Sequence, residues 1–507
     1  MEGPSGDAKG LLEAGSQRLD ARLGEAARGA GEVTIGLARA GRASAYRVVS
    51  WASARAVAPN SVTAISLLLA LCSAAWLSGG TAADNLRGLA AIGGWLAARV
   101  SARHLQAFVA QRQPRRAEAA DERPGGSDWL ILPAYNWSAG VPVPRAAAPT
   151  MPRFGERSYD WLFGVSTVAA ECAIYGGMAA GGIAAGWSGT WPLAISTVVF
   201  VSVASIARTC AQAVAGPGGA GQAGPAAWLW NGIGALLAPP VGVRVLLAAL
   251  IMVRYGPRLA LVVVCVLEVI SLSRTVATMA TRRPVRAPHP GRTPADALRA
   301  VTSGQNVLLA CRDDGPLARW AGRLVAGNLT PMPPALAGLV AVVLLVALGI
   351  KNLPGVIALT PVLVLLLAAP GAGHPHDGRL DWLVPVLICL GQYCYLAAFG
   401  LARGVPGPAV FATCSMTAVW YAGLAAAPPR NAGARTKVLT SRQARVRQIV
   451  LRPADGIGGE ARICVVCLTA ALGVATFGYL GLAAYLAALM CRKAVVGYLI
   501  GEEDQRP

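Results

Sequence analysis

Long runs of apolar residues recur along most of this chain and decide what it can fold into. About 20 consecutive apolar residues form a helix that crosses the ~30 Å hydrocarbon core of a bilayer. Hydrocarbon offers no partner to backbone N–H and C=O groups, so each run must satisfy its own hydrogen bonds as a helix. We predict twelve spanning helices, near residues 61–79, 86–108, 161–186, 190–215, 236–254, 258–279, 334–350, 354–369, 382–402, 407–427, 462–477 and 479–499.

The composition excludes most other classes of protein. Of 507 residues, 55% are hydrophobic and only 14% are charged, whereas a soluble domain carries about 25% charged residues. A soluble globular protein, a disordered chain and a disulfide scaffold are therefore ruled out. The net charge of +20 could serve nucleic acid or an anionic membrane surface. The apolar runs favour the membrane, so the lipid bilayer is the expected partner and nucleic acid is not.

The basic residues predict the topology. Three Arg-rich segments, 111–159, 281–333 and 428–461, alternate with loops that hold few basic residues. Basic loops remain in the cytoplasm. We therefore expect a multi-pass protein of the bacterial cytoplasmic membrane with both termini in the cytoplasm. Residues 1–44, which carry charge of both signs, are expected to be a poorly ordered or surface-helical tail.

Two landmarks recur in the second half of the chain and suggest a duplication. Asp160-Trp-Leu is followed by Glu171, and Asp381-Trp-Leu is followed by Gln392 at the same distance. Arg244 and Arg462 each begin a later span. The expected fold is an all-α membrane bundle of two parallel six-helix modules, although a third Asp-Trp-Leu shows that chance is an alternative. The predicted division is 1–44 tail, 45–280 first module with a cytoplasmic insertion at 111–159, 281–315 basic cytoplasmic linker, 316–501 second module and 502–507 polar tail.

Charged residues within spans are costly and mark candidate sites. The acids inside or beside spans are Asp84, Asp160, Glu171, Glu268 and Asp381.

Asp160 and Glu171 share one helix face, since eleven residues return to within ~20° of the same direction. We expect a polar pocket formed by them with Arg208, the expected partner of Glu171, and with Arg99 and Arg103. The alternative is a structural ion pair between helices, with Asp160 as an N-cap.

Two arginines at helix starts are candidate anion sites. Arg244 and Arg462 follow Gly-containing turns, and an Arg beside a helix N-terminus can hold phosphate. Anchoring of the helix ends in the cytoplasm is the alternative. Asp381 and Gln392 would be the second-module counterparts of Asp160 and Glu171.

Small residues in the third span indicate close packing. Gly177 and Gly181 are spaced so that another helix can approach closely. The contact could lie inside the bundle or at a dimer seam.

Several stretches resemble CDP-alcohol phosphatidyltransferases, from one bacterial branch of that family, followed by an uncharacterised membrane domain found after such modules in actinobacteria. The stretches are 58–63 (APNSVT), 160–178, 240–244 (PVGVR), 314–319 (DGPLAR), 381–385 (DWLVP) and 458–462 (GGEAR). The resemblance implies six-helix membrane enzymes, often dimers, that displace CMP from a CDP-linked lipid or alcohol with another alcohol. It also implies a divalent metal held by D-x2-D-G-x2-A-R…G-x3-D-x3-D.

The chain departs from this motif where metal ligands are needed. The end of the second span carries Arg99 and Arg103 and no carboxylate, and Gly164 stands where an Asp is expected. Mg²⁺ needs several carboxylate oxygens, so we predict no metal site and transfer no catalytic residues. Residues 314–319 match half the motif but precede the seventh span, and we interpret that match as chance.

Three functions remain after the sequence is read. The first is a non-catalytic membrane scaffold that binds an anionic lipid head group or a nucleotide at its cytoplasmic face. We expect this scaffold to need no cofactor, and the resemblance is compatible with a homodimer. The second is an active phosphotransferase that uses Mg²⁺ or Mn²⁺ in a non-standard site. The third is a twelve-helix transporter.

Overall fold

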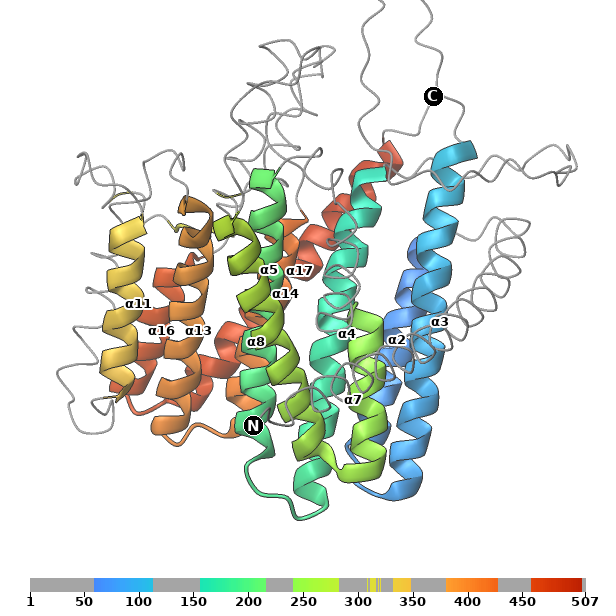
Figure 1. Ribbon diagram of the computed structural model, residues 1–507, viewed down its shortest axis with the longest axis horizontal. Helices are drawn as coiled ribbons and strands as arrows, with labels where there is room; N and C mark the ends of the chain where they lie inside the picture. Colours follow the sequence, from blue (N-terminus) through green and yellow to red (C-terminus); the bar gives the residue numbers. More distant parts are fainter. Residues whose placement is uncertain are drawn as a thin grey trace, which may run out of the picture. The chain divides into compact units, whose positions relative to one another are not determined.

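The computed structural model describes residues 59–112, 156–215, 240–281, 308, 311–315, 318, 320, 332–347, 380–426 and 457–503. Within these ranges all the regular secondary-structure elements are helices, which agrees with the predicted all-α class. They are α2 Pro59–Leu77, α3 Ala82–Arg112, α4 Glu156–Ala184, α5 Thr190–Ala215, α7 Val241–Tyr255, α8 Pro257–Thr281, α11 Met332–Ala347, η2 Asp381–Leu383, α13 Val384–Ala402, α14 Gly407–Ala425, α16 Gly459–Ala471 and α17 Ala475–Glu503 (Figure 1).

Seven helices in the described ranges are long and apolar enough to cross a membrane, and they confirm a polytopic membrane protein embedded in lipid. Their apolar stretches are Asn60–Leu77, Trp161–Ala184, Thr190–Val214, Pro257–Ala280, Asp381–Ala402, Gly407–Ala425 and Ala475–Val495. The predicted span at 354–369 lies outside the described residues.

Three predicted spans differ from the helices that the structure contains. Helix α3 has 31 residues and exceeds its prediction, whereas α7 has 15 residues and α16 has only 13. The predicted span 462–477 is wrong at its end, because a turn at Gly473, with φ of 76°, separates α16 from α17. Uncharged residues continue through that turn, so the apolar pattern alone did not reveal it.

The chain divides into two compact units. One comprises Met1–Val62 and Ala97–Met151, and the other comprises Thr63–Leu96 and Pro152–Pro507. The second unit contains most of the described helices and all of the packing considered below.

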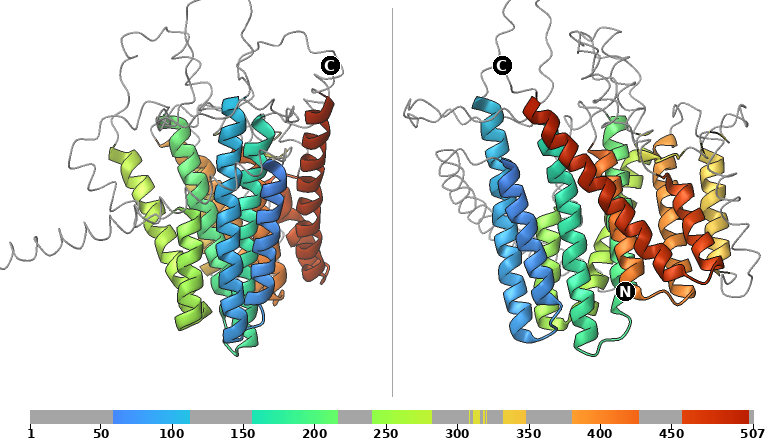
Figure 2. Two further views of the ribbon diagram at one scale, coloured as in Figure 1. Left: turned by 90° about the vertical axis from the view of Figure 1, so that its right-hand side faces the viewer. Right: turned by 180° about the vertical axis from the view of Figure 1, so that it is seen from behind.

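The helix packing of the second unit repeats itself. Helix α5 packs against α4 and α8, and α8 packs against α7; likewise α14 packs against α13 and α17, and α17 packs against α16. These helices form two sets, a first set of α4, α5, α7 and α8 and a second set of α13, α14, α16 and α17. The sets meet where α14 contacts α4 and α5, where α13 contacts α5, and where α17 contacts α4. Figure 2 shows α17 running obliquely across the other helices of its set.

Helix directions alternate in both sets. Helices α4, α7, α13 and α16 run one way, and α5, α8, α14 and α17 run back (Figure 1). The end of α8 and the starts of α11 and α13 therefore lie on one side of the unit, together with the end of α14 and the start of α16. The end of α8 and the start of α11 border the Arg-rich segment 281–333, and the end of α14 and the start of α16 border the Arg-rich segment 428–461.

The glycines of α4 pack inside the bundle. A Cβ at Gly177 would collide with the backbone of Ala74, and one at Gly181 would collide with the carbonyl oxygen of Leu77. Both neighbours belong to α2. The missing side chains therefore let α2 and α4 approach closely, which is the in-bundle contact that the spacing allowed.

Candidate functional site

A buried arginine joins three helices in the first set. Arg244 is the fourth residue of α7 and is only 1% exposed. Its guanidinium donates hydrogen bonds to the carboxylates of Glu171 on α4 and Glu268 on α8, and both acids are also buried. The planar guanidinium presents several donors in a fixed fork, which suits two carboxylates at once.

A second arginine and two hydroxyl groups complete this cluster. Arg208 of α5 lies 3.7 Å from the Glu268 carboxylate and donates to the Ser271 hydroxyl at 3.0 Å. The Tyr175 hydroxyl donates to Glu171 at 3.3 Å. The cluster thus contains two cations and two carboxylates. The Arg208 side chain is 33% exposed, so this cation lies near the edge of the cluster.

The cluster corrects the expected pairing of Glu171. The acid is paired with Arg244, while Arg208 is paired with Glu268. Sequence spacing could not show this, because the partners lie 73 positions apart and meet only through helix packing. Arg244 and Glu268 are thus the members that the predicted pocket lacked, and Glu268 could have been found among the few acids inside spans.

The other members of the predicted pocket belong to the other compact unit or are only partly described. Asp160 is the fifth residue of α4, which begins at Glu156, so the N-cap interpretation is wrong; its side chain lies outside the described part. Arg99 and Arg103 lie on α3 in the other compact unit, where Arg103 is exposed.

The carboxylates of this cluster do not fit a divalent cation. Mg²⁺ requires several oxygen ligands at about 2.1 Å and gives up its water reluctantly. Glu171 and Glu268 both bond to Arg244, whose positive charge occupies the place between them. Within the described ranges, no group of three or more His, Cys, Asp or Glu side chains is arranged to hold a metal ion.

The second set contains a comparable arginine with different partners. Arg462 is the fourth residue of α16, is fully buried, and donates to the carboxylate of Asp313 at 2.5 Å. Its guanidinium also lies over the ring of Trp420, 5.5 Å from the centroid. The positions of Arg244 and Arg462 in their helices thus match, but each guanidinium is bound by protein carboxylates rather than left open for a phosphate.

Gln392 and Asp381 occupy buried positions near the start of the second set. The Oε1 atom of Gln392 accepts a hydrogen bond from the Tyr421 hydroxyl at 2.7 Å. Asp381 begins the short helix η2 that leads into α13 and is 5% exposed. Gln392 is uncharged, so the acid for Arg462 has to come from another part of the chain.

Residues 311–315 provide that acid and pack on the start of α16. Asp313 has a φ of 53°, and its carbonyl oxygen accepts a hydrogen bond from the Gly459 backbone at 3.3 Å. The Glu460 carboxylate accepts from the backbone N–H groups of Gly315 and Ala318, each at 3.2 Å. Gly315 and Ala318, within the stretch 314–319 whose match to the motif we interpreted as chance, therefore help to build the second cluster.

Burial changes the acidity of two carboxyl groups here. Burial raises the pKa of Asp313 above its ordinary value, although the Arg462 guanidinium opposes the shift. Burial likewise raises the pKa of Glu460, although the backbone N–H groups stabilise its charge. Both shifts have the same cause, because a buried carboxylate loses the water that would stabilise its charge.

A comparison with protein-family models, with curated proteins and with solved structures found no match to this chain.

Proposed function

We propose that this chain is a non-catalytic membrane scaffold related to CDP-alcohol phosphatidyltransferases. The single observation that carries the proposal is the Arg244 guanidinium bound by both Glu171 and Glu268. These carboxylates neutralise a protein cation, so they are not free to hold a metal and a pyrophosphate. The Arg99 and Arg103 side chains, where the family has acids, point to the same conclusion.

The Arg244 cluster suits a structural role. It connects α4, α7 and α8 at one point, and its three central members, Arg244, Glu171 and Glu268, are almost completely buried. Removing one partner from a buried ion pair leaves an uncompensated charge and is strongly unfavourable. The cluster thus holds three helices in one arrangement.

The proposal includes twelve spans in two parallel modules, with the Arg-rich side in the cytoplasm. Support comes from the matched positions of Arg244 and Arg462 and from the repeated packing of α4, α5, α7 and α8 in α13, α14, α16 and α17. The shared side on which the helix ends border the Arg-rich segments supports the topology.

An anionic head group or nucleotide would then bind at exposed arginines rather than at the two buried ones. Arg244 and Arg462 are buried and bound to protein carboxylates, whereas the Arg103 side chain is exposed to solvent. A guanidinium at the surface can meet the phosphate of a lipid head group without having to leave the protein interior.

Release of CMP tests the proposal directly. The full chain, purified into lipid nanodiscs, is incubated with a CDP-alcohol lipid, an acceptor alcohol and either Mg²⁺ or Mn²⁺. We expect no CMP above the level of empty nanodiscs, from protein whose thermal unfolding shows that it is folded. Turnover that Asp160→Asn abolishes would overturn the proposal in favour of an active phosphotransferase with a non-standard metal site.

A further inference from the structure

Helices α5 and α14 share a pattern of residues near their starts. Trp191 is followed by a proline in α5, and Gly407 is followed by a proline in α14, with a threonine at the same distance further along each helix. When the helices are aligned in this way, residues 194–200 and 410–416 are buried at the same positions. Trp191 and Gly407 therefore stand at equivalent places in the two helices.

The two threonines of this pattern have matching hydrogen-bond partners. The Thr197 hydroxyl can donate to a carbonyl oxygen of its own helix at 2.8 Å or to that of Leu261 on α8 at 3.4 Å. The Thr413 hydroxyl can donate to a carbonyl oxygen of its own helix at 3.1 Å or to that of Tyr479 on α17 at 2.8 Å. Leu261 and Tyr479 are separated by the same number of positions as the buried arginines of α7 and α16. The match between the sets therefore includes how their helices pack.

The contacts between the two sets are reciprocal. The first helix of each set packs against the second helix of the other, since α4 contacts α14 and α13 contacts α5. The repeated Asp-Trp-Leu sequences follow the same arrangement. The Trp161 indole N–H donates to the carbonyl oxygen of Gly423 on α14 at 3.0 Å, and Trp382 belongs to η2, which contacts α5. Two identical subunits related by a twofold axis touch in this reciprocal way.

Trp191 and Gly407 meet each other where the sets join. A Cβ atom at Gly407 would lie 2.6 Å from the Cβ atom of Trp191, and the Trp191 ring lies 5.5 Å from the ring of Phe411 on α14. A residue beside a twofold axis contacts its own equivalent in the other subunit. The axis of the reciprocal arrangement therefore passes beside Trp191 and Gly407.

These two positions are filled in a complementary way. An indole on one side meets a residue without a side chain on the other, so the space at the axis is occupied once. Two copies of the first set would bring Trp191 against Trp191 and overpack this space. Two copies of the second set would bring Gly407 against Gly407 and leave a gap. Each set therefore fits the other set better than a second copy of itself.

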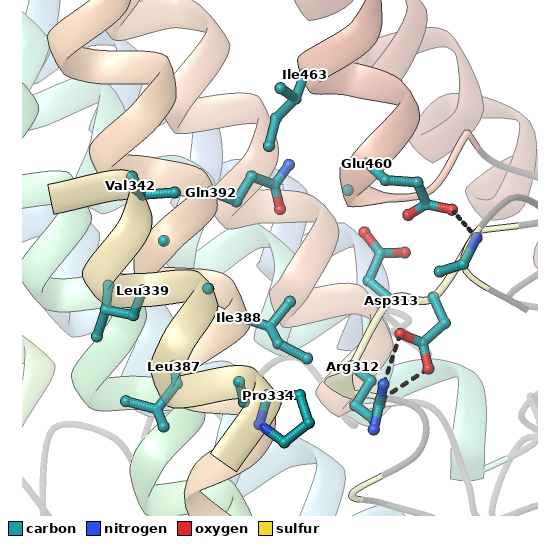
Figure 3. A pocket seen from close by; sticks show the side chains of 16 residues that line it. Arg312, Asp313, Pro334, Leu339, Val342, Leu387, Ile388, Gln392, Glu460 and Ile463 are labelled. Carbon is teal, nitrogen blue, oxygen red and sulfur yellow. Dashed lines mark hydrogen bonds and ion pairs between the residues drawn. The ribbon is translucent and has the colours of Figure 1, made fainter. Parts of the chain in front are cut away.

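The sets are less alike at a distance from this axis. Glu460 lies beside a small cavity between α11, α13 and the start of α16 (Figure 3). Arg462 is paired with Asp313, which precedes the helices of the second set, whereas Arg244 is paired with two acids of its own set. The charged clusters thus differ while the contacts around the axis match, so the shared feature of the two sets is the surface through which they meet.

We propose that α4 and α5 form an interaction surface whose partner is the second set of the same chain, and that the protein is a monomer in the membrane. The two sets close on each other as the subunits of a dimer do, and a closed interface of this kind leaves no copy of the surface free. The proposal rests on the duplication included in the proposed function but not on the absence of catalysis, so release of CMP would leave it standing.

The oligomeric state of the full chain is the first test. The chain is labelled with one fluorophore at its N-terminus and reconstituted into large vesicles over a range of protein-to-lipid ratios, and its photobleaching steps are counted. We expect single-step bleaching to the same extent as for a membrane protein that is a known monomer, at every ratio. A two-step population that exceeds that of the monomeric reference would overturn the proposal.

A swap of two residues tests the axis itself. Gly407→Trp brings two indoles together and Trp191→Gly leaves a gap, so each change should lower the thermal unfolding midpoint by about 5 °C or more. The double variant has the composition of the unchanged protein and again places one indole at the axis, so its midpoint should lie above those of both single variants. A double variant whose midpoint does not exceed both single values would overturn the equivalence of the two positions. If the single variants fail to fold, the photobleaching count on the unchanged protein decides.

Discussion

Arg244 donates a hydrogen bond to the carboxylate of Glu268, which lies 24 positions later on the adjacent helix α8. The same guanidinium reaches Glu171 on α4, so one side chain neutralises two buried acids. The favourable charge interactions depend on all three helices remaining in place, because each partner comes from a different one. This relationship makes the first set of helices sensitive to single changes in charge.

Replacement of Arg244 by Met should destabilise the protein strongly. The variant leaves Glu171 and Glu268 buried without their common cation, and we expect a loss of about 3–5 kcal/mol in the free energy of unfolding. Chemical unfolding in detergent, followed by circular dichroism, measures the change.

Arg254 offers a matched control, since it lies on the same helix but is exposed. Arg254→Met should change stability by less than about 1 kcal/mol. A triple variant with Arg244→Met, Glu171→Gln and Glu268→Gln should recover part of the loss, because the uncompensated charges are gone. Equal losses in the two single variants would contradict a structural role for the cluster.

Two adjacent acids should respond differently to neutralisation. Asp313→Asn leaves the fully buried Arg462 without its carboxylate, and a loss of about 3–5 kcal/mol is expected. Asp314 has a side chain that is 12% exposed and pairs with Arg312, so Asp314→Asn should cost less. Unfolding of both variants under one set of conditions gives the comparison, and a larger loss in Asp314→Asn would contradict the assignment of Asp313 to Arg462.

The contact between α2 and α4 should not tolerate a larger residue at Gly181. A side chain there meets the backbone of Leu77, and overpacking of this kind costs about 1–3 kcal/mol. Gly181→Ala should therefore lower the unfolding midpoint. Gly93 is the matched control, because nothing lies within 4 Å of a Cβ at that position; Gly93→Ala should be neutral or slightly stabilising. Equal effects at both positions would argue against the close approach.

Stability should depend on pH through Glu460. Burial raises the pKa of this group above its ordinary value of 4.5, so the folded state holds its proton more tightly than the unfolded state. The contribution of Glu460 to stability is then greatest near pH 4.5 and below, and it is lost as the pH rises through the raised pKa.

Thermal unfolding at several pH values checks this dependence. The midpoint of Glu460→Gln, relative to the unchanged protein, should rise as the pH increases from 4.5 towards neutrality. Leu468→Ala changes an exposed residue of the same helix that does not titrate, and its offset should stay constant. A constant offset for Glu460→Gln as well would refute the role of this carboxyl group.

Much of the fold could be predicted from the sequence, because lipid imposes strong rules on composition. Apolar runs located the seven long helices, and the spacing of Gly177 and Gly181 indicated close helix contact. The ends of the shorter helices were harder to predict, since the turn at Gly473 lies in an uncharged stretch. Composition therefore locates helices better than it locates turns between them.

The candidate site was only partly predictable. The cost of burying charge singled out Glu171, and the position at a helix start singled out Arg244 and Arg462. The structure places all three inside the protein. The partners could not be assigned, because Arg462 meets Asp313 across 149 positions of sequence. Such a pairing depends on how a loop folds back on a helix, which periodicity does not report.

The shortness of α7 and α16 has a consequence for the surrounding bilayer. Fifteen and thirteen residues rise about 22 Å and 20 Å, less than the ~30 Å of hydrocarbon in a typical membrane. A bilayer accommodates a short span by thinning locally around it. We therefore expect the protein to prefer membranes with shorter acyl chains, in which less thinning is needed.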